Sequence, residues 1–357
     1  MPYQQLTSYG LSSRFEQDAL LFPELTLARV TGQHRNIYTI ITEHGEAHAL
    51  VSGKFIHCAN TNTDFPVVGD WVMVSLADIE QTAIIHHILP RKTTFERRAA
   101  GTQNTVQIVA SNIDYIFICM SLNNDFNLRR LERYLSIAWQ GTATPVVVLT
   151  KSDLCADLAN KLQQVAAVSL GVNVLVTSIL QSDNYKVFAP YLSKEKTVVF
   201  LGSSGVGKSS LVNQLLGKDV FLTQAVGSDD SGRHTTTSRQ LLVLPNGGAV
   251  IDTPGMRELQ LDTGNLAKAF EDIESLALQC KYRNCTHTSE NRCAVQQAIS
   301  DGTLSLERLE SYRKLARETQ YEGLNSRQLE HAKINNMFGS VSEFSKLRRH
   351  VKNNRNN

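Results

Sequence analysis

The sequence predicts a multidomain α/β protein with a small β-barrel at the N-terminus, a mostly parallel sheet covered by helices at the centre, and a helical C-terminal region. Three patterns predict this fold. Short apolar runs separated by turn residues precede residue 90, strand and helix patterns alternate from about residue 112, and a charged helical pattern follows residue 265. We place the domains at residues 1–97, 98–264 and 265–357.

The composition is typical of a globular protein, with 42% hydrophobic and 20% charged residues among 357. No apolar run approaches the roughly 20 residues that a membrane-spanning helix needs. The first residues, MPYQQLTSYGLSSRF, lack the basic and apolar regions of a secretory signal. We therefore expect a cytoplasmic protein without a membrane partner. The net charge of +2 does not by itself predict nucleic-acid binding.

Five short runs of strand character predict the barrel. They cover residues 25–32, 35–42, 47–51, 67–75 and 81–89. Periodicity does not distinguish an oligonucleotide-binding barrel from a barrel without a ligand. The following stretch, Leu89 to Gly101, is polar and basic and is predicted to be a linker.

The central domain alternates strands with helices, which favours a parallel sheet with helices on its faces. Strands are expected at residues 114–122, 145–153, 173–178 and 196–202, with helices at 127–140, 157–170 and 207–217. A pair of strands turning at PNGG, residues 245–248, ends the domain.

Gly202 to Ser209, GSSGVGKS, matches the phosphate-loop pattern G-x-x-x-x-G-K-[ST] between a strand and a helix. Backbone N–H groups of such a loop surround phosphates, Lys208 supplies a positive charge, and the Ser209 hydroxyl binds Mg²⁺. The alternative is a Gly- and Ser-rich turn. The expected nucleotide-binding residues are Gly202, Ser203, Ser204, Gly205, Val206, Gly207, Lys208, Ser209 and Ser210.

Thr150, Lys151, Ser152 and Asp153 follow an apolar strand and are typical of a guanine-binding loop. A carboxylate at Asp153 accepts hydrogen bonds from guanine N1–H and the 2-amino group, whereas adenine has no such donor pair. The Lys151 stem can lie along the base. Ser178, after the next strand, is expected to lie behind the base, where backbone N–H groups could contact it. If the chain had no phosphate loop, the preferred interpretation of residues 150–153 would be a solvated loop.

Two further segments complete a nucleotide site. Asp252 ends a strand in DTPG and is expected to hold Mg²⁺ through water, while the Gly255 N–H reaches the γ-phosphate. In GRHTTT, residues 232–237, we expect Thr236 to complete the Mg²⁺ shell. The alternatives are a strand-end cap for Asp252 and a turn for the threonines.

Together the five motifs indicate a GTPase in which the guanine-binding loop precedes the phosphate loop. This order differs from the usual one by a cyclic shift, which a domain with neighbouring termini tolerates. An ATP-dependent enzyme is the less favoured alternative because of Asp153.

The motifs TKSD, GSSGVGKS, GRHTTT and DTPG, in this order, resemble the circularly permuted GTPases that depend on the small ribosomal subunit, the RsgA/YjeQ family. The resemblance covers nearly the whole chain. It implies an OB-fold barrel, a permuted G domain and a zinc domain. It also implies GTP and GDP as ligands, with the small ribosomal subunit and its rRNA as partners during late maturation.

Cys280, Cys285, His287 and Cys293 offer three thiolates and an imidazole within 14 residues. Four such ligands close a tetrahedral zinc shell, which predicts a structural Zn²⁺ site. The alternative is a set of unligated thiols. The spacing also matches the zinc ligands of the resembled family. The remaining cysteines, Cys58, Cys119 and Cys155, are predicted to be buried, reduced thiols.

Catalysis is expected to involve Lys208, Thr236 and His234. Ras-like enzymes orient water with a Gln after the DxxG motif, but Met256 stands there in this chain. The imidazole of His234 is the candidate that orients or deprotonates the water, and the resemblance points to the same residue. The alternative is a solvated loop histidine. If hydrolysis is lost, the chain would be a GTP-sensing adaptor.

The C-terminal region contains two charged segments. Residues 305–320 mix both signs and are predicted to form a solvated helix, whereas residues 331–357 carry six basic residues and one acid. Such a tail fits an arm that contacts RNA phosphates, although solubility alone would also explain it. Because DTPG leads within about 25 residues to the segment before Cys280, we expect the C-terminal domain and the barrel to change relative position with nucleotide state. We expect a monomer.

Overall fold

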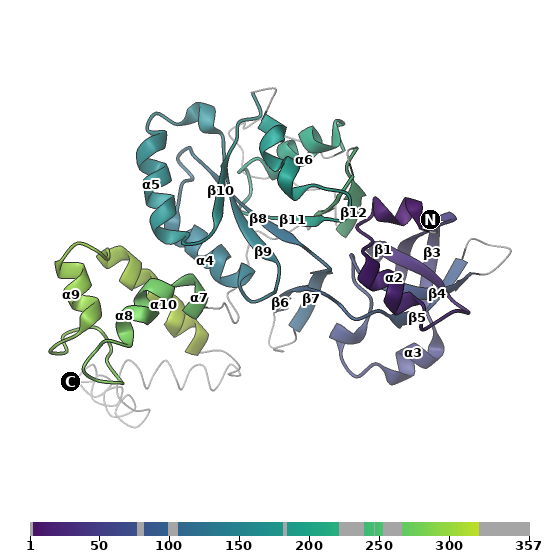
Figure 1. Ribbon diagram of the computed structural model, residues 1–357, viewed down its shortest axis with the longest axis horizontal. Helices are drawn as coiled ribbons and strands as arrows, with labels where there is room; N and C mark the ends of the chain where they lie inside the picture. The colour runs from purple at the N-terminus through teal and green to yellow at the C-terminus, as the bar shows by residue number, and fades with distance from the viewer. Residues whose placement is uncertain are drawn as a thin grey trace, which may run out of the picture.

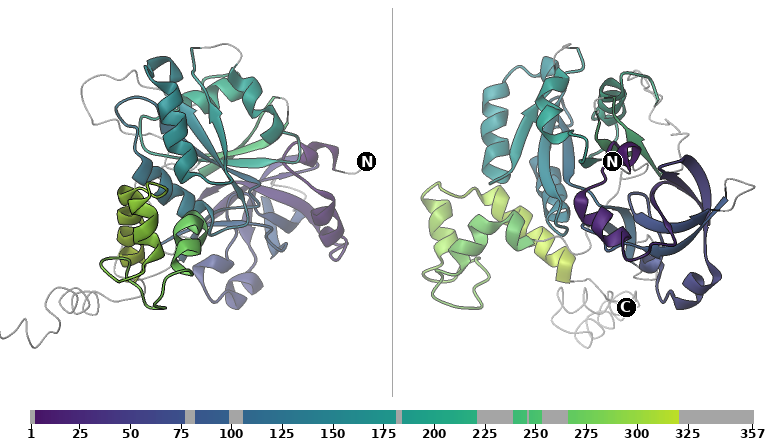
Figure 2. Two further views of the ribbon diagram at one scale, coloured as in Figure 1. Left: turned by 60° about the vertical axis from the view of Figure 1, so that its left-hand side comes forward. Right: turned by 45° about the vertical axis from the view of Figure 1, so that its right-hand side comes forward.

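The computed structural model describes residues 3–76, 82–98, 106–180, 184–220, 239–245, 247–252 and 266–320. An α/β domain lies at the centre, with the barrel on one side and the C-terminal helices on the other (Figures 1 and 2). No helix in these described ranges is both long and apolar enough to cross a membrane.

The N-terminal strands close into a barrel. They are β1 (Thr26–His34), β2 (Ile37–Thr42), β3 (Gly45–Val51), β4 (Trp71–Leu76) and β5 (Thr82–Ile88). The pairing order β1-β2-β3-β5-β4 returns to β1, and the β3–β5 pair is parallel. This is the OB-like barrel that the resemblance implied. A short helix α3 (Gly53–Cys58) and a 3₁₀ turn η1 (Asn62–Asp64) connect β3 to β4.

Alternation along the strands gives the barrel two apolar faces. One set of side chains fills the interior, including Ala28, Val30 and Val72. Their neighbours Leu27, Trp71 and Met73 face outward and pack against α1 (Gln4–Thr7) and α2 (Ser13–Ala19). Leu6, Leu11 and Phe15 of this N-terminal segment are buried. The sequence analysis did not predict these two helices, which cover a barrel face that would otherwise expose apolar surface.

The central sheet contains β8 (Tyr115–Ser121), β9 (Thr144–Thr150), β10 (Asn173–Val176), β11 (Thr197–Leu201), β12 (Arg239–Val243) and β13 (Ala249–Asp252). The strand order is β10-β9-β8-β11-β13-β12, and the first four pairings are parallel. β12 and β13 form the expected antiparallel pair. The sheet therefore has the mostly parallel arrangement that the apolar strand runs predicted.

Both faces of the sheet are covered, which explains why its strands are apolar throughout. Ile116 and Ile118 belong to the face that packs with helices α4 (Leu128–Ala138) and α5 (Leu158–Val168). Phe117 and Cys119, which alternate with them, pack with α6 (Lys208–Leu216) and the 3₁₀ helix η3 (Asn184–Tyr191). α6 ends at Gly217, whose φ of 66° is a helix-terminating conformation that glycine adopts without strain.

The predicted linker is partly a strand. β6 (Thr94–Arg98) pairs with β7 (Val106–Ser111), so regular structure lies on both sides of the domain boundary that we predicted at residue 97. Thr93 is buried beside this pair, and its hydroxyl exchanges hydrogen bonds with the backbone of Ile113. β6 consists mostly of polar residues instead of an apolar run, so the sequence pattern did not indicate a strand there.

The barrel and the central domain are joined through main-chain pairing and one buried arginine. β1 pairs with β12 at Gly32 and Gln33, which makes one continuous sheet. Arg29 is fully buried and donates hydrogen bonds to the carbonyls of Gly69, Tyr9 and Asn112. Burial lowers the pKa of Arg29 to about 9, while Asp114 and Asp70 oppose the shift. The guanidinium therefore holds together the N-terminal segment, the barrel and the central domain.

The C-terminal unit (residues 266–320) consists of α7 (Leu266–Ala269), α8 (Glu271–Ala277), α9 (Ala294–Ser300) and α10 (Leu306–Gln320). The prediction that residues 305–320 form a helix is correct, but the prediction that it is solvated is wrong. Arg308, Leu309 and Leu315 are at most 5% exposed. The partners of Arg308, Glu132 and Asp272, are distant in sequence, so the mixed-charge pattern did not reveal this burial.

Gly69 provides a test of the junction. It has a φ of +100°, and a Cβ there would lie 2.2 Å from the carbonyl oxygen of Ser111. Gly69→Ala is expected to lower the free energy of unfolding by roughly 3 kcal/mol or more, because it adds a backbone clash to the conformational strain. Gly45→Ala is the matched control, since Gly45 has a φ of +119° and open space around it. Urea unfolding midpoints would measure both, and equal losses would contradict this account of the junction.

Candidate functional site

The predicted nucleotide-binding loops follow neighbouring parallel strands. Ser121 at the end of β8 is in register with Thr150 at the end of β9, and Ile118 of β8 is in register with Leu201 of β11. All three strands therefore end at the same edge of the sheet, where ligands bind in open α/β folds. The loops after β9 and β11 meet there although 45 residues or more separate them in the chain.

The phosphate loop approaches β8 closely at its first residue. Gly202 has a φ of +150°, and a Cβ there would lie 2.4 Å from the carbonyl oxygen of Cys119. Gly205 and Gly207 also have positive φ values, of 76° and 96°. This backbone conformation directs successive N–H groups inward, as an anion-binding loop requires. Burial raises the pKa of Cys119 to about 12, so the thiol beneath the loop stays protonated.

Lys208 begins α6 and bends back over the loop. Its Nζ donates hydrogen bonds to the carbonyls of Gly202 at 2.7 Å and Ser203 at 2.6 Å. The ammonium group is thus held at the mouth of the loop, where the helix N-terminus adds positive potential. Ser209 and Ser210 lie in the first turn of the same helix, and both are partly exposed.

One hydrogen bond joins the two predicted loops directly. The Thr150 hydroxyl donates to the carbonyl oxygen of Val206 at 2.6 Å, and Thr150 is 5% exposed. Lys151, the next residue, has a φ of 55°, which turns the chain sharply after β9. Ser152 and Asp153 follow in the 3₁₀ turn η2 (Ser152–Leu154). The predicted guanine-binding loop therefore lies against the phosphate loop.

Asp153 is held by the loop after β10. The hydroxyl of Ser178 donates a hydrogen bond to Asp153 Oδ1, and the same hydroxyl oxygen accepts from the Leu180 N–H at 3.2 Å. The backbone N–H of Ser152 donates to the Thr177 carbonyl at 3.2 Å. We expected Ser178 to lie behind the base, where backbone N–H groups could contact it. The structure shows that its side chain also orients the carboxylate of Asp153.

Asp252 is the last residue of β13, which pairs in parallel with β11. Asp252 is in register with Gln240 of β12. The other residues predicted for the switch segments lie outside the described residues. They are His234, Thr236, Gly255 and Met256.

Two residues that the sequence analysis did not single out contact the phosphate loop. Arg130 Nη1 donates to Ser203 Oγ at 2.8 Å and lies 2.8 Å from both oxygens of Asp125. The Ser203 hydroxyl in turn donates to Asp125 Oδ2 at 2.9 Å. No motif marks these residues. The only signal is a helix N-cap at Asn127, six residues after the end of β8, which begins α4 near this edge of the sheet.

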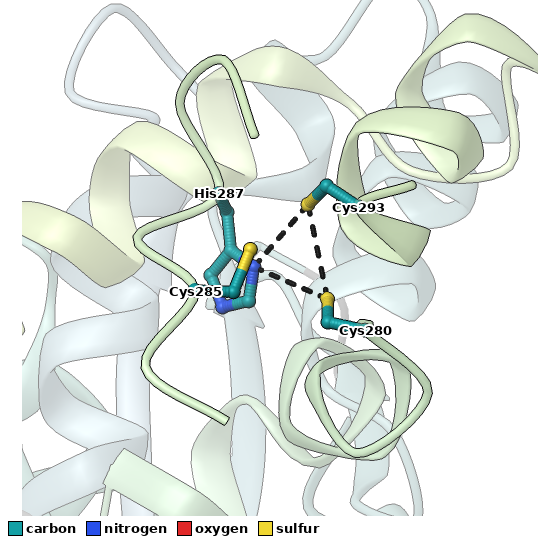
Figure 3. A group of neighbouring side chains, drawn as sticks. All are labelled: Cys280, Cys285, His287 and Cys293. Carbon is teal, nitrogen blue, oxygen red and sulfur yellow. Dashed lines mark hydrogen bonds between the residues drawn. The ribbon is translucent and has the colours of Figure 1, made fainter. Parts of the chain in front are cut away.

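The four predicted metal ligands converge in the C-terminal unit (Figure 3). One ligand atom from each of Cys280, Cys285, His287 and Cys293 lies within 4.8 Å of all the others. The Sγ atoms of Cys280 and Cys293 are 3.8 Å apart, and His287 Nδ1 lies 3.6 and 3.4 Å from them. Tetrahedral zinc with Zn–S bonds of about 2.3 Å places two sulfurs about 3.8 Å apart. The cluster therefore fits a tetrahedral metal ion.

The surroundings of the cluster shift the pKa values of its ligands in different directions, and burial is the main reason that the pKa of Cys285 is raised to about 11. Burial lowers the pKa of His287, which keeps the imidazole neutral. Burial tends to raise the pKa of Cys280, but hydrogen bonds from the backbone of Val295 and Ala294 outweigh it and lower the pKa. Among the other cysteines, Cys119 is buried as predicted. The prediction is wrong for Cys155, which is only half-buried, and for Cys58, whose side chain is exposed on the short helix α3.

Known proteins resemble this chain in sequence and in architecture. Residues 88–262 match the family model described as RsgA GTPase. The chain is 52% identical over 344 residues to the small ribosomal subunit biogenesis GTPase RsgA 2 of Lactiplantibacillus plantarum, covering 96% of this chain and 97% of the relative.

The chain belongs to the RsgA GTPase family.

Further RsgA relatives agree with this assignment. A small ribosomal subunit biogenesis GTPase RsgA 1 of Listeria innocua is 43% identical over 88% of this chain and 90% of its own length. Among solved structures, YjeQ from Thermotoga maritima has a TM-score of 0.62 and 25% identity, covering 82% of this chain and 98% of that chain. YloQ, described as a circularly permuted GTPase, has a TM-score of 0.60 and 25% identity, covering 83% and 95%.

Thr150→Val tests the bond between the two loops. Valine matches threonine in shape but leaves the Val206 carbonyl without its donor, so we expect a loss of about 1 kcal/mol in stability and about fivefold in guanine-nucleotide affinity. Thr177→Val is the matched control because Thr177 is buried, and within the described part of the chain its hydroxyl has no hydrogen-bond partner. Fluorescent-nucleotide titration would measure affinity. Equal effects of the two variants would contradict the role of the Thr150 hydroxyl.

Proposed function

We propose that this RsgA-family protein binds and hydrolyses GTP during biogenesis of the small ribosomal subunit. The observation that carries the proposal is the hydrogen bond from Thr150 to Val206, which places the guanine-binding and phosphate loops against each other. The printed names of the relatives support the biological setting, since they are called small ribosomal subunit biogenesis GTPases.

The described residues suit successive parts of the nucleotide. Asp153, oriented by Ser178, would accept the guanine N1–H and 2-amino hydrogens. Lys208 would exchange its carbonyl partners for the β- and γ-phosphates, which are stronger acceptors because they are charged. Ser209 and Asp252 would hold Mg²⁺, with Thr236 as the further ligand. The product would be GDP with inorganic phosphate.

The hydrolytic step needs a group that orients water, and Met256 cannot provide it. We assign this role to His234, whose imidazole can accept a proton near neutral pH. The switch segment should be complete only when the protein is docked on the small subunit. GTP hydrolysis would therefore be slow in the free protein and faster on the small subunit. The partner would include rRNA, contacted by the OB-like barrel and by the basic residues after His331. The protein would act in the cytoplasm as a monomer.

The Cys/His cluster would hold one structural Zn²⁺. The three thiolates and the imidazole close a four-coordinate shell, so the ion would have no open position for catalysis. The ion would stabilise the loop between α8 and α9, where ligands rather than apolar side chains supply much of the packing.

GTP turnover tests the proposal. We expect purified small subunits to accelerate phosphate release at least about tenfold, since activating partners of GTPases supply much larger factors. Large subunits and free RNA should not do so, and ATP should not compete for binding. The same assay with His234→Ala should lose the stimulated rate while nucleotide affinity stays nearly intact. Binding to small subunits without any stimulated release would instead identify a GTP-sensing adaptor.

Zinc content tests the metal site. Cys293→Ser removes one thiolate, so we expect the purified protein to lose its single Zn²⁺ and to unfold at a lower temperature. Cys58→Ser is the matched control because Cys58 is an exposed thiol on α3, far from the cluster in sequence. Colorimetric zinc release and thermal melts would measure both changes. Equal zinc content in the two variants would exclude the cluster as the binding site.

A further inference from the structure

The first turn of α4 contacts the phosphate loop through Arg130. Its Nη1 atom lies 2.8 Å from Ser203 Oγ and 2.8 Å from each oxygen of Asp125. Ser203 is also the residue whose carbonyl holds the Lys208 ammonium at 2.6 Å. Arg130 therefore reaches the side chain of a loop residue whose backbone positions the phosphate-binding lysine. The Asn127 side chain caps the helix by accepting from the Arg130 N–H at 3.0 Å, which fixes where this turn begins.

The next turn of α4 contacts the C-terminal unit through Glu132. Glu132 Oε1 accepts from Arg308 Nη1 at 2.8 Å, and both side chains are at most 5% exposed. Arg308 also pairs with Asp272 at 2.6 Å and lies over the ring of Phe270. Burial raises the pKa of Glu132, while the nearby Ser311 hydroxyl and the charge of Arg308 oppose the shift. A buried pair with this many contacts fixes the orientation of α4 and α10 relative to each other.

The contacts continue from α10 to the Cys/His cluster. Arg313, on α10, donates to the carbonyl oxygens of His287 and of Thr286, the latter at 3.2 Å. α4 lies between the central sheet and the C-terminal helices, as the views of the chain show (Figures 1 and 2). A series of polar contacts therefore runs from Ser203 through α4 and α10 to the backbone of His287.

We propose that Arg130 is a positioning residue of the phosphate loop, and that the contact between Glu132 and Arg308 sets its position. The inference rests on nucleotide binding at the phosphate loop, as proposed above. It assigns the coupling between the nucleotide site and the C-terminal unit to α4. The sequence had suggested the segment after Asp252 instead, and residues 253–265 lie outside the described residues.

Charge explains why Arg130 should matter for nucleotide binding. Asp125 Oδ2 lies 2.9 Å from Ser203 Oγ, so a carboxylate stands beside a loop that must accept phosphates. Arg130 neutralises this carboxylate, and its contact with Ser203 holds the loop in place. Without Arg130 the uncompensated charge of Asp125 would repel the phosphates, an effect that salt would weaken.

Arg130→Met is the first test, with release of a fluorescent GDP analogue as the readout. We expect dissociation to accelerate about fivefold or more at low salt, and less at high salt. Arg129→Met is the matched control, because it removes the same charge from the neighbouring residue, whose partner Glu310 is 53% exposed. It should change dissociation by less than about twofold. Equal rates for the two variants would overturn the proposal.

A second substitution separates positioning from simple loss of stability. Adding Asp125→Asn to Arg130→Met removes the uncompensated carboxylate, so GDP dissociation should slow toward the wild-type rate. A purely structural role would instead leave the double variant as fast as the single one, and that result would overturn the electrostatic account.

A double-mutant cycle tests the coupling through α4. Glu132→Gln keeps the shape of the side chain but removes its charge, while Arg308 retains Asp272. We expect it to accelerate GDP dissociation about twofold in the wild-type background and to have no effect in Arg130→Met. Equal effects in both backgrounds would show that Glu132 acts independently of Arg130.

These outcomes are distinct from failure of the proposed function. If the wild-type protein bound no guanine nucleotide, the proposed function itself would fail. If it bound GDP and Arg130→Met bound equally well, only the role of Arg130 would be lost.

Discussion

The parallel register of β9, β8 and β11 is the constraint on which the nucleotide site depends. Because these three strands run in the same direction and end together, the loops that follow β9 and β11 share one edge of the sheet. The order in which these strands occur along the chain does not change where the two loops lie. A cyclic shift in the order of the motifs therefore still brings the two predicted loops to one edge, where the Thr150 hydroxyl joins them through the carbonyl of Val206.

Much of the fold could be predicted because its signals are local. Strands buried on both faces, such as β8 and β11, are continuous apolar runs, and the barrel strands alternate between two apolar faces. What could not be predicted depends on distant partners. α1 and α2 are helical because Leu6 and Phe15 cover the barrel, and β6 is a strand because β7 pairs with it. In α10, the buried state of Arg308 depends on acids far away in the chain.

The same distinction applies to the site. Phosphate binding requires glycines, a lysine and a serine at fixed spacing, so the pattern itself predicts a phosphate loop, and the structure shows positive φ at its glycines. The Cys/His spacing predicts a shared metal site for a similar reason, and the structure brings the four side chains together. Arg130 and Asp125 carry no such pattern, because many residue pairs could contact Ser203 Oγ from a neighbouring helix. Ser178 was singled out because it follows a strand, but its hydrogen bond to Asp153 depends on how two loops pack.

The pairing of β1 with β12 has a consequence for how the chain is made. Gly32 and Gln33 pair with β2 on one side, but their partners on the other side, Gln240 and Arg239, come about 200 residues later in synthesis. Arg29 likewise completes its hydrogen bonds only after the carbonyl of Asn112 has been synthesised. The first domain to emerge from translation therefore carries an incomplete strand edge until two thirds of the polypeptide exists. The junction between the barrel and the central domain is therefore completed only after most of the central domain has been translated, whereas β1 and β4 can close the barrel earlier.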